Sequence, residues 1–401
     1  MERRTFLLAP AVLLAASACA PPRGVTYWNL FTGSDGSRMT EMVNSIDVQV
    51  EPVTLTWGEP YYTKLAMAAA GGRAPDLAIL HLSRLTSFAG LLDPFDDAML
   101  AANGLTADRF PSGLWSRTSN AGRTYAVPLD THPLVLFYNT EICGKAGLLD
   151  NGRLKPLRGE RDLLTAFQRA KQVTGRLGVA LAGIHDVNPW RLFWTLYRQQ
   201  GGDLRPGDRP LDDAKALRTL RFLREVSEQS QFTDYAAAVA LFSNGAAGFY
   251  WNGEWELATF TEQGLPFDVA PFPQIYDRRG IWADSHSFVL PHQHDRDPER
   301  TRRTVEAVSA LVRKSLTWSK GGHIPAYLPV ANSPDYHSNY RSAADEVELD
   351  PPLWFAGTAS DMQTTAGAIF GAVMSGAASP ESALGDFTSA FRHLANTPRP
   401  A

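Results

Sequence analysis

VTYWNLFTGSDGSRMTEMVNSIDVQVEPVTLTWGEPYYTKLAMAAAGGRAPDLAIL, residues 25–80, is the stretch that decides the fold of this chain. Its apolar runs predict three strands, at residues 25–30, 48–56 and 77–80. Between them we expect a helix over 37–45 with Asp35 as its cap, and a second helix over 59–70 that ends at two glycines. This order of strands and helices is typical of an α/β domain with a mostly parallel sheet.

The alternation continues through the rest of the chain. Further strands are expected at 125–128, 134–138, 246–250, 267–270 and 287–290. Further helices are expected at 161–174, 212–228, 299–315 and 380–394. A chain of 401 residues is too long for one compact core and suggests two domains. Because no single Pro/Gly-rich linker divides it, we expect the chain to cross between two lobes more than once.

The first 19 residues have the pattern of an export signal. Two arginines near the start precede an apolar run over 6–16, which is shorter than the ~20 residues that span a bilayer. Small residues then lead to Cys19. This pattern predicts a signal peptide over 1–18, acylation of Cys19, and a short tether over 19–23.

Two details of this signal leave alternatives open. Ala16 stands where a lipidation signal usually carries Leu, so an ordinary cleaved signal with an incidental Cys19 is the alternative. The Arg3-Arg4 pair also resembles a twin-arginine export signal. In every case we expect a bacterial protein that works outside the cytoplasm, in the periplasm or lipid-anchored at the outer face of the cytoplasmic membrane.

Charge and cysteine content exclude some classes of protein. The formal net charge is −4, with 38 basic and 42 acidic residues scattered along the chain, which argues against a nucleic-acid partner. Cys19 and Cys143 are the two cysteines, so lipidation of Cys19 leaves no intrachain disulfide. We expect Cys143 to be buried and unreactive, and the fold to depend on burial of apolar surface.

Catalytic motifs are absent from the sequence: it contains no Gly-x-Ser-x-Gly elbow, phosphate-binding loop, dinucleotide fingerprint or His-Glu-x-x-His pair. The segment 292–295, HQHD, has the composition of a metal site, but it directly follows a strand and is interpreted as a solvated loop. We therefore expect no metal and no cofactor. A glycoside hydrolase would need two carboxylates across a cleft, and the candidates are Asp130, Glu254 and Asp284.

Several segments instead combine an aromatic residue, a polar side chain and a turn near the end of a strand. They lie at 56–58, 75–81, 128–133, 251–255, 282–286 and 321–325. Ligands of open α/β sheets bind at the carboxyl ends of strands. Flat aromatic faces among hydrogen-bonding groups suit a sugar, which has apolar C–H faces and a rim of hydroxyls.

Each tryptophan also has a plain interpretation as a core residue. Trp251 and Trp255 flank a turn after a strand, so we interpret them as pocket residues. The core interpretation is kept for Trp115, Trp318 and Trp354, and Trp190 with Trp194 is ambiguous between core and pocket wall.

The same segments, taken in order, resemble the motifs of one family. They are WNLFTG at 28–33, YYTKL at 61–65 with GGRAPDL at 71–77, YAVPLD at 125–130 with FYN at 137–139, and FSNGAAG at 242–248 with NGEW at 252–255. The chain resembles the extracellular solute-binding proteins of family 1, the carbohydrate receptors of ABC importers. The short link at 45–48 departs from the family pattern, in which a longer helix end is usual.

The resemblance implies two α/β lobes joined by crossovers that act as a hinge. The first lobe would comprise 24–130 and about 269–322, and the second 131–268 and 323–401. A ligand would bind between the lobes and favour their closure. By position, the resemblance implies a ligand-binding role for Ser34, Asp35, Trp57, Asp76, His81, Asp130, Trp251, Glu254, Trp255, Asp284, His286, His323 and Tyr327.

The implied function is that of a substrate-binding lipoprotein that delivers a carbohydrate to a membrane permease. We expect a monomer. A glycerophosphodiester or polyol-phosphate receptor is an alternative, but the candidate site is rich in acids and histidines and poor in arginines, with Arg38 and Arg191 as the residues that could change this balance. A secreted glycoside hydrolase or lyase is the alternative from a different class.

Overall fold

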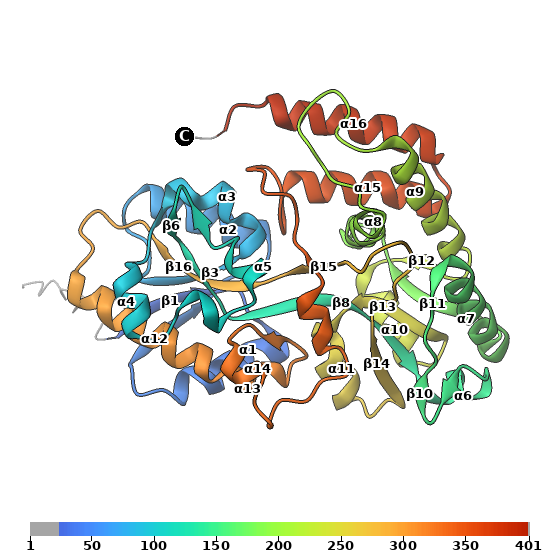
Figure 1. The fold of residues 1–401 in the computed structure, drawn as a ribbon, viewed down its shortest axis with the longest axis horizontal. Helices are drawn as coiled ribbons and strands as arrows, with labels where there is room; N and C mark the ends of the chain where they lie inside the picture. Colours follow the sequence, from blue (N-terminus) through green and yellow to red (C-terminus); the bar gives the residue numbers. More distant parts are fainter. Residues whose placement is uncertain (1–23, 400–401) are drawn as a thin grey trace, which may run out of the picture.

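The computed structural model describes residues 24–399 as two α/β lobes side by side (Figure 1). The predicted signal peptide (1–18), Cys19 and the tether (19–23) lie outside the described residues. Within 24–399, no helix is long and apolar enough to cross a lipid bilayer.

The first lobe is built on a sheet with strand order β2-β1-β3-β16-β4, in which β7 also pairs with β16. Its strands are β1 (Val25–Asn29), β2 (Val50–Thr54), β3 (Leu77–His81), β4 (Leu92–Asp93), β7 (Ala126–Pro128) and β16 (His286–Pro291), beside the small hairpin of β5 (Ser119–Asn120) and β6 (Arg123–Thr124). Its helices are α1 (Gly33–Asn44), α2 (Glu59–Ala70), α3 (Leu85–Phe88), α4 (Asp97–Ala102), α5 (Ser112–Trp115), α12 (Pro298–Arg313), α13 (Ser315–Ser319) and α14 (Leu328–Ala331).

The second lobe has a larger sheet, with order β12-β11-β13-β8-β15-β18 and with β14 and β17 also paired to β8. Its strands are β8 (Asp130–Asn139), β11 (Leu177–Ala182), β12 (Phe232–Thr233), β13 (Ala247–Gly253), β14 (Phe267–Pro271), β15 (Ile281–Asp284), β17 (Ile324–Pro325) and β18 (Val347–Glu348), beside the hairpin of β9 (Leu149–Asp150) and β10 (Arg153–Leu154). Its helices are α6 (Thr140–Lys145), α7 (Gly159–Thr174), α8 (Asn188–Gln199), α9 (Asp213–Ser227), α10 (Tyr235–Ser243), α11 (Leu257–Glu262), α15 (Asp361–Ser375) and α16 (Pro380–Asn396).

The expected start of the fold is present, with one helix end displaced. The helix expected at 59–70 has those bounds, because Gly72 takes a left-handed φ of 62° that ends it. By contrast, α1 begins at Gly33, so Thr32 is its N-cap residue and Asp35 lies in its first turn instead of capping it. The carboxylate of Asp35 there complements the positive end of the helix dipole.

Both sheets are mixed, where a mostly parallel arrangement was expected. The pairs β1–β2, β1–β3, β11–β12 and β11–β13 are parallel, as the local β–α–β order requires. The strands that pass between the lobes enter the sheets antiparallel: β16 against β3, and β8 against β13. The crossovers therefore account for the departure from the expected parallel sheets.

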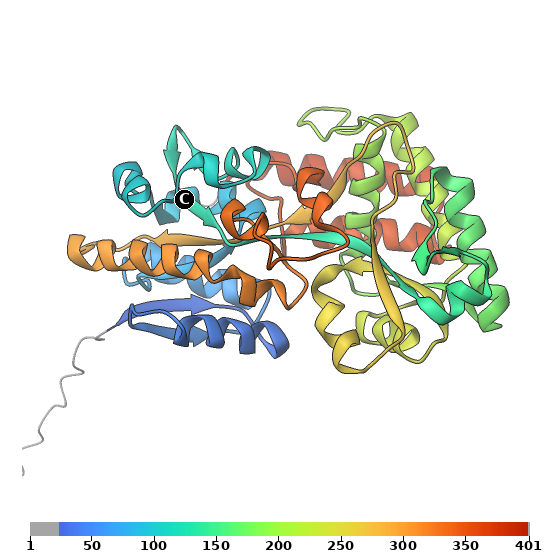
Figure 2. The ribbon, with the colours of Figure 1, turned by 60° about the horizontal axis from the view of Figure 1, so that its bottom comes forward.

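The chain passes between the lobes in three places, which Figure 2 shows near the middle of the molecule. The first is the step from β7 into β8, and the second is the step from β15 into β16. The third runs from β17, which pairs with the first residues of β8, past α14 to Tyr336 and Tyr340 in the core of the second lobe.

The predicted lobe boundaries need correction at two of these places. Strands β14 and β15 pair with β8, so residues 269–284 lie in the second sheet and not in the first lobe. Beyond residue 322, Ala326 and Tyr327 pack in the core of the first lobe. The periodicity of a strand does not reveal which of two sheets it joins, which is why the sequence misplaced these segments.

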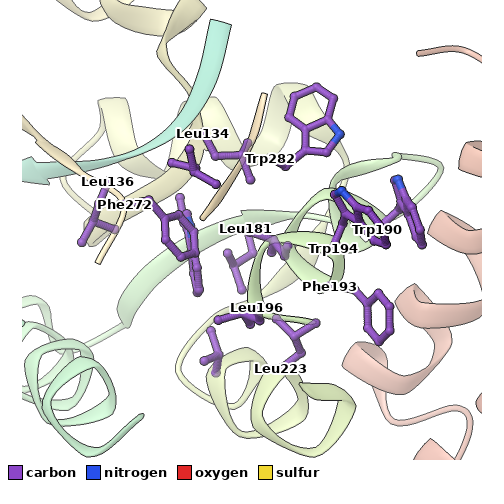
Figure 3. Packing of buried hydrophobic residues seen from close by; sticks show 14 of the residues in the cluster. Leu134, Leu136, Leu181, Trp190, Phe193, Trp194, Leu196, Leu223, Phe272 and Trp282 are labelled. Carbon is purple, nitrogen blue, oxygen red and sulfur yellow. The ribbon is translucent and has the colours of Figure 1, made fainter. Parts of the chain in front are cut away.

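The core of the second lobe is rich in aromatic side chains (Figure 3). Trp190 and Trp194 on α8 stack with ring centroids 5.3 Å apart, and both are at most 2% exposed. These two ambiguous tryptophans are thus core residues. Cys143 is fully buried, as expected, and burial raises its pKa to about 12.

Trp251 lies in this core as well, which corrects its assignment to the pocket. It sits on β13 with no exposed surface, and its ring packs 4.6 Å from Phe272 and 6.4 Å from Phe167. Strand β13 is buried along its whole length, so both of its faces are covered. A turn-flanking position therefore does not place Trp251 near a ligand.

A buried carboxyl group anchors two tryptophans of this core. Asp350 accepts hydrogen bonds from Nε1 of Trp190 (2.7 Å) and Nε1 of Trp282 (3.2 Å), and its other oxygen accepts one from Gln363 (3.0 Å). Burial raises the pKa of Asp350 to about 6, while the tryptophan hydrogen bonds act in the opposite direction.

We predict that Trp251→Ala lowers the free energy of unfolding by about 3–5 kcal/mol, because it leaves a large cavity in a closed core. Urea denaturation measures the change. Trp57→Ala is the matched control, since the Trp57 side chain is 50% exposed and its loss should cost less than about 0.5 kcal/mol. Equal stability of the two variants would contradict the core position of Trp251.

We also predict a pH-dependent contribution from Asp350. Its pKa in the folded protein lies above its ordinary value, so the folded state keeps a proton that the unfolded chain releases between about pH 4 and 6. The stability contributed by this group is greatest at low pH and falls as the pH rises through that window. Relative to Asp350→Asn, the wild-type protein should lose about 2 kcal/mol of unfolding free energy between pH 4 and 7. A difference that stays constant with pH in urea titrations would refute this.

Candidate functional site

A cavity of about 750 Å³ lies between the two lobes and is lined by both. We call it the cleft. Its volume falls in the range of small-molecule sites, which is roughly 300–1,000 Å³. The first lobe contributes the start of α1, the turn before α2 and the end of β3, and the second lobe contributes mainly α8, the segment after β13 and the start of α15.

The wall from the first lobe presents polar groups and one large aromatic ring. Ser34 and Asp35 lie in the first turn of α1, and Trp57 lies in the turn before α2. His81 ends β3 at the base of this wall, with Nδ1 held 2.5 Å from the hydroxyl of Tyr62. A wall that carries both a half-exposed indole and a carboxylate is suited to a ligand with apolar and hydroxyl faces.

The opposite wall is more aromatic and carries a buried cation. The guanidinium of Arg191 lies 4.4 Å from the ring centre of Trp282 and 5.2 Å from that of Trp255. Nε1 of Trp255 donates to the Tyr235 hydroxyl (2.7 Å), which in turn donates to Glu256. These contacts fix the indole planes, so the aromatic surface is rigid before a ligand arrives.

The floor of the cleft is a cluster of histidines around one buried carboxylate. Asp130 accepts from the backbone N–H of His286 (2.8 Å) and from Nε1 of Trp318 (2.6 Å). Its two oxygens lie 3.2 Å from Nδ1 of His132 and 2.7 Å from Nδ1 of His286. Burial alone would raise the pKa of Asp130, but these imidazoles hold it well below its ordinary value.

A second buried carboxylate faces the same cluster. Nδ1 of His323 lies 2.9 Å from Glu254, and Nε2 of the same ring lies 3.2 Å from Asp35. Burial raises the pKa of Glu254 to about 7. Burial also works against the charged form of His323, but Asp35 and Glu254 outweigh it and raise the pKa of that ring well above its usual value.

The structure brings together nine of the thirteen predicted site residues. Seven line the cleft: Ser34, Asp35, Trp57, His81, Trp255, His286 and His323. Asp130 and Glu254 lie beneath its floor with no exposed surface. That any of these nine contacts a ligand stays a prediction.

Asp284 joins the lobes beside the cleft and does not line it. Its carboxylate accepts from the backbone N–H of Ser83 (3.1 Å) and from the hydroxyl of Thr358 (2.7 Å), and also from the hydroxyl of Ser83. These hydrogen bonds connect the first lobe to the segment before α15. The buried carboxylates Asp130 and Asp284 are thus both occupied by hydrogen-bond donors.

Asp76 and Tyr327 lie away from the cleft, which corrects two further predictions. Asp76 binds the backbone N–H of Thr26 (2.8 Å) and pairs with Nε of Arg300 (2.7 Å), fixing α12 to the first sheet. The ring of Tyr327 packs 5.6 Å from that of Phe110 in the core of the first lobe. Both residues hold the fold together.

Sequence reasoning missed part of the cleft wall. His132, His185, Asp186, Tyr235, Glu256, Asp361 and Gln363 line the cavity but were not selected. The start of α15 was detectable, because Ser360 has the cap position and its hydroxyl accepts from the backbone N–H of Gln363 (3.2 Å). Its approach to the cleft depends on tertiary packing, for which the sequence holds no local signal.

Two lobes, a lined cleft and three crossovers are the features expected of a hinged solute receptor. A family model described as bacterial extracellular solute-binding protein matches residues 40–302. That match covers more than half of the chain, so the chain belongs to this family, and the resemblance stated from the sequence is confirmed.

The comparisons with individual proteins are more distant. The arabinooligosaccharide-binding protein of Bacillus subtilis (strain 168) is 24% identical over 214 residues, which cover 50% of this chain. The match spans about half (47%) of that curated relative. The sequence identity alone therefore does not transfer its ligand.

Solved structures of similar fold cover nearly the whole chain. The GacH receptor of Streptomyces glaucescens, studied unliganded and with acarbose, has a TM-score of 0.75 at 22% identity, with 92% of this chain and 98% of that chain covered. UgpB from Mycobacterium tuberculosis in complex with glycerophosphocholine has a TM-score of 0.79 at 14% identity, with 94% and 99% covered. Maltose-bound MalE3 of T. maritima has a TM-score of 0.76 at 17% identity, with 92% and 99% covered. These likenesses confirm the two-lobed α/β fold.

Proposed function

We propose that this protein is the substrate-binding receptor of an ABC importer and that its cleft captures a carbohydrate, an oligosaccharide or sugar derivative. The observation that carries the proposal is the pairing of aromatic faces on both walls, Trp57 from one lobe and Trp255 from the other, in a cleft with a polar rim. A solute that contacts both walls stabilises the closed arrangement of the lobes.

The related proteins support this class of solute. The arabinooligosaccharide-binding protein, GacH with acarbose, and the maltose-bound MalE3 are named for saccharides or saccharide-like ligands. The partner would be the membrane permease of the importer. We propose further that the chain is exported, that Cys19 carries a lipid anchor, with twin-arginine export as one route, and that the receptor works as a monomer.

One observation favours a second candidate, a glycerophosphodiester or polyol phosphate. Arg191 lines the cleft as a buried guanidinium, and the structural relative UgpB binds glycerophosphocholine. Carboxylates line the same cavity, including Asp35, Asp186 and Glu256, and they oppose an anionic solute. The balance of charge therefore favours a neutral sugar.

A thermal-shift screen against oligosaccharides, amino sugars and glycerophosphodiesters tests the proposal. A solute at 100 times its Kd stabilises the folded state by about 2.7 kcal/mol, which raises the melting temperature measurably. Each hit is recovered and analysed. An intact saccharide supports a receptor, an intact phosphodiester selects the second candidate, and a cleaved product establishes an enzyme instead.

With a saccharide in hand, we predict that Trp57→Ala and Trp255→Ala each weaken binding by more than about 1 kcal/mol, because each removes a stacking face. Calorimetric titration measures the affinity. Met67→Ala is the matched control, since Met67 is 71% exposed on the same helix that Trp57 precedes and does not line the cleft. Unchanged affinity in both tryptophan variants would remove the aromatic walls from the binding site.

A further inference from the structure

Four buried ionisable side chains meet where the chain passes between the lobes. One oxygen or ring nitrogen of each lies within 4.8 Å of those of the others, in the group Asp130, His132, His286 and His323. None of the four residues is more than 6% exposed. They come from the three crossing segments: β8 supplies two, β16 supplies one, and the residue just before β17 supplies the fourth.

The spacing of these atoms suits a metal ion. Nδ1 of His286 and Nδ1 of His323 lie 2.7 and 3.7 Å from Oδ2 of Asp130, and Nδ1 of His132 lies 3.2 Å from Oδ1. A tetrahedral metal with bonds of about 2.0–2.1 Å keeps its ligand atoms about 3.3 Å apart. These distances lie on both sides of that value, so small movements that let Asp130 present one oxygen to all three rings would place four ligand atoms around one ion.

Two groups at the cluster lack the hydrogen bonds that burial demands. Among the described residues, Nδ1 of His323 and both oxygens of Glu254 have no hydrogen-bond partner of acceptable geometry, although Nδ1 lies 2.9 Å from the Glu254 carboxylate. Such buried groups without hydrogen bonds are costly, and a bound ion is one way to satisfy them. A cation at this point would engage the Nδ1 lone pair of His323 and place a positive charge near the Glu254 carboxylate, which is not itself one of the proposed ligands.

The ring of His323 is held in the orientation that a metal ligand needs. Nε2 lies 3.2 Å from Asp35, and in the neutral ring its N–H donates to that carboxylate and leaves the Nδ1 lone pair directed at the cluster. The ring also stacks on Trp318, with centroids 4.6 Å apart and planes at 9°. A carboxylate behind the far nitrogen and a packed ring face are the supports that fix histidine ligands in metal sites.

We propose that the floor of the cleft binds one divalent transition-metal ion of the zinc type, with four ligands: Asp130, His132, His286 and His323. Three imidazoles and one carboxylate form a set that suits zinc and similar ions better than magnesium or calcium, which prefer oxygen. On binding, the ring protons of His132 and His286 that face Asp130 from Nδ1 leave that position, each neutral ring carries its proton on Nε2, and the Nδ1 lone pairs go to the metal. The backbone N–H of His286 and Nε1 of Trp318 remain as donors to Asp130.

The proposed metal site does not include the histidines of the HQHD segment at 292–295. His292 and His294 belong to the surface loop at 292–295, where Nδ1 of His292 pairs with Asp93 at 2.7 Å. The proposed ligands are instead far apart in the sequence, and the crossovers bring them together. The bound ion would join all three crossing segments and stiffen the hinge, whatever solute the cleft takes.

The experiment uses the full chain, purified without a polyhistidine tag and stripped of metal with EDTA. Calorimetric titration with Zn²⁺ should give one ion per chain, and Co²⁺ should give the intense visible absorption of a tetrahedral site. His132→Gln and His323→Gln should each weaken Zn²⁺ binding by at least about 100-fold. His292→Gln, which removes a histidine from the surface loop, is the matched control and should leave the affinity unchanged.

Three results would overturn the proposal: no saturable Zn²⁺ binding by the wild-type chain, loss of binding in His292→Gln, or binding that survives both ligand substitutions. If no Zn²⁺ binds, a proton on His323 would supply the positive charge beside Glu254 instead of a metal ion. If a ligand variant does not fold, as judged by circular dichroism, the Co²⁺ spectrum of the wild-type chain decides, since a weak octahedral spectrum contradicts the four-ligand site. Solute binding is measured separately in EDTA, so a failed saccharide screen and a failed metal titration remain distinguishable.

Discussion

The buried carboxylate of Asp130 is the interaction on which the arrangement of the two lobes depends. It stands at the first residue of β8 and binds His132 on the same strand, His286 on β16 and Trp318 on α13. A charge with no exposed surface is tolerated only when such donors surround it. The donors come from both sides of the junction, so the requirement to pair one carboxylate fixes how the crossing strands meet.

The position of this cluster connects the hinge to the cleft. His132, His286 and His323 contact the buried carboxylates on one side and line the cleft on the other. Asp284 adds a second link, through Ser83 of the first lobe and Thr358 of the second. A change in the separation of the lobes must therefore alter either these hydrogen bonds or the shape of the cleft floor. If the lobes move about this hinge as proposed, hinge motion and solute contact would be coupled directly through the residues they share.

Local sequence patterns predicted most helices and strands. The positions of individual side chains in the core or the cleft depended on tertiary contacts. Periodicity and Gly72 fixed α2 at 59–70, and the first three strands followed from their apolar runs. The sequence could not separate Trp251 from Trp255, because both flank the same turn and only packing buries one of them. Asp76 was likewise indistinguishable from a ligand residue until α12 brought Arg300 against it. The histidine cluster joins residues more than 150 positions apart, a distance over which spacing carries no information.

The structure divides recognition and mechanical support between two kinds of side chain. Aromatic faces occupy the walls, where Trp57 is half exposed and Trp255 is held by Tyr235. Charged and titratable groups occupy the floor. Because they are buried there, a polar atom without a hydrogen-bond partner is costly, and the arrangement of their partners is specific. If the proposed function holds, a solute contacts both walls only when the lobes approach each other, and the floor would keep them in register as they do. On the proposed function, the aromatic walls would select the solute, and the buried polar floor would determine how rigidly the two walls are presented to it.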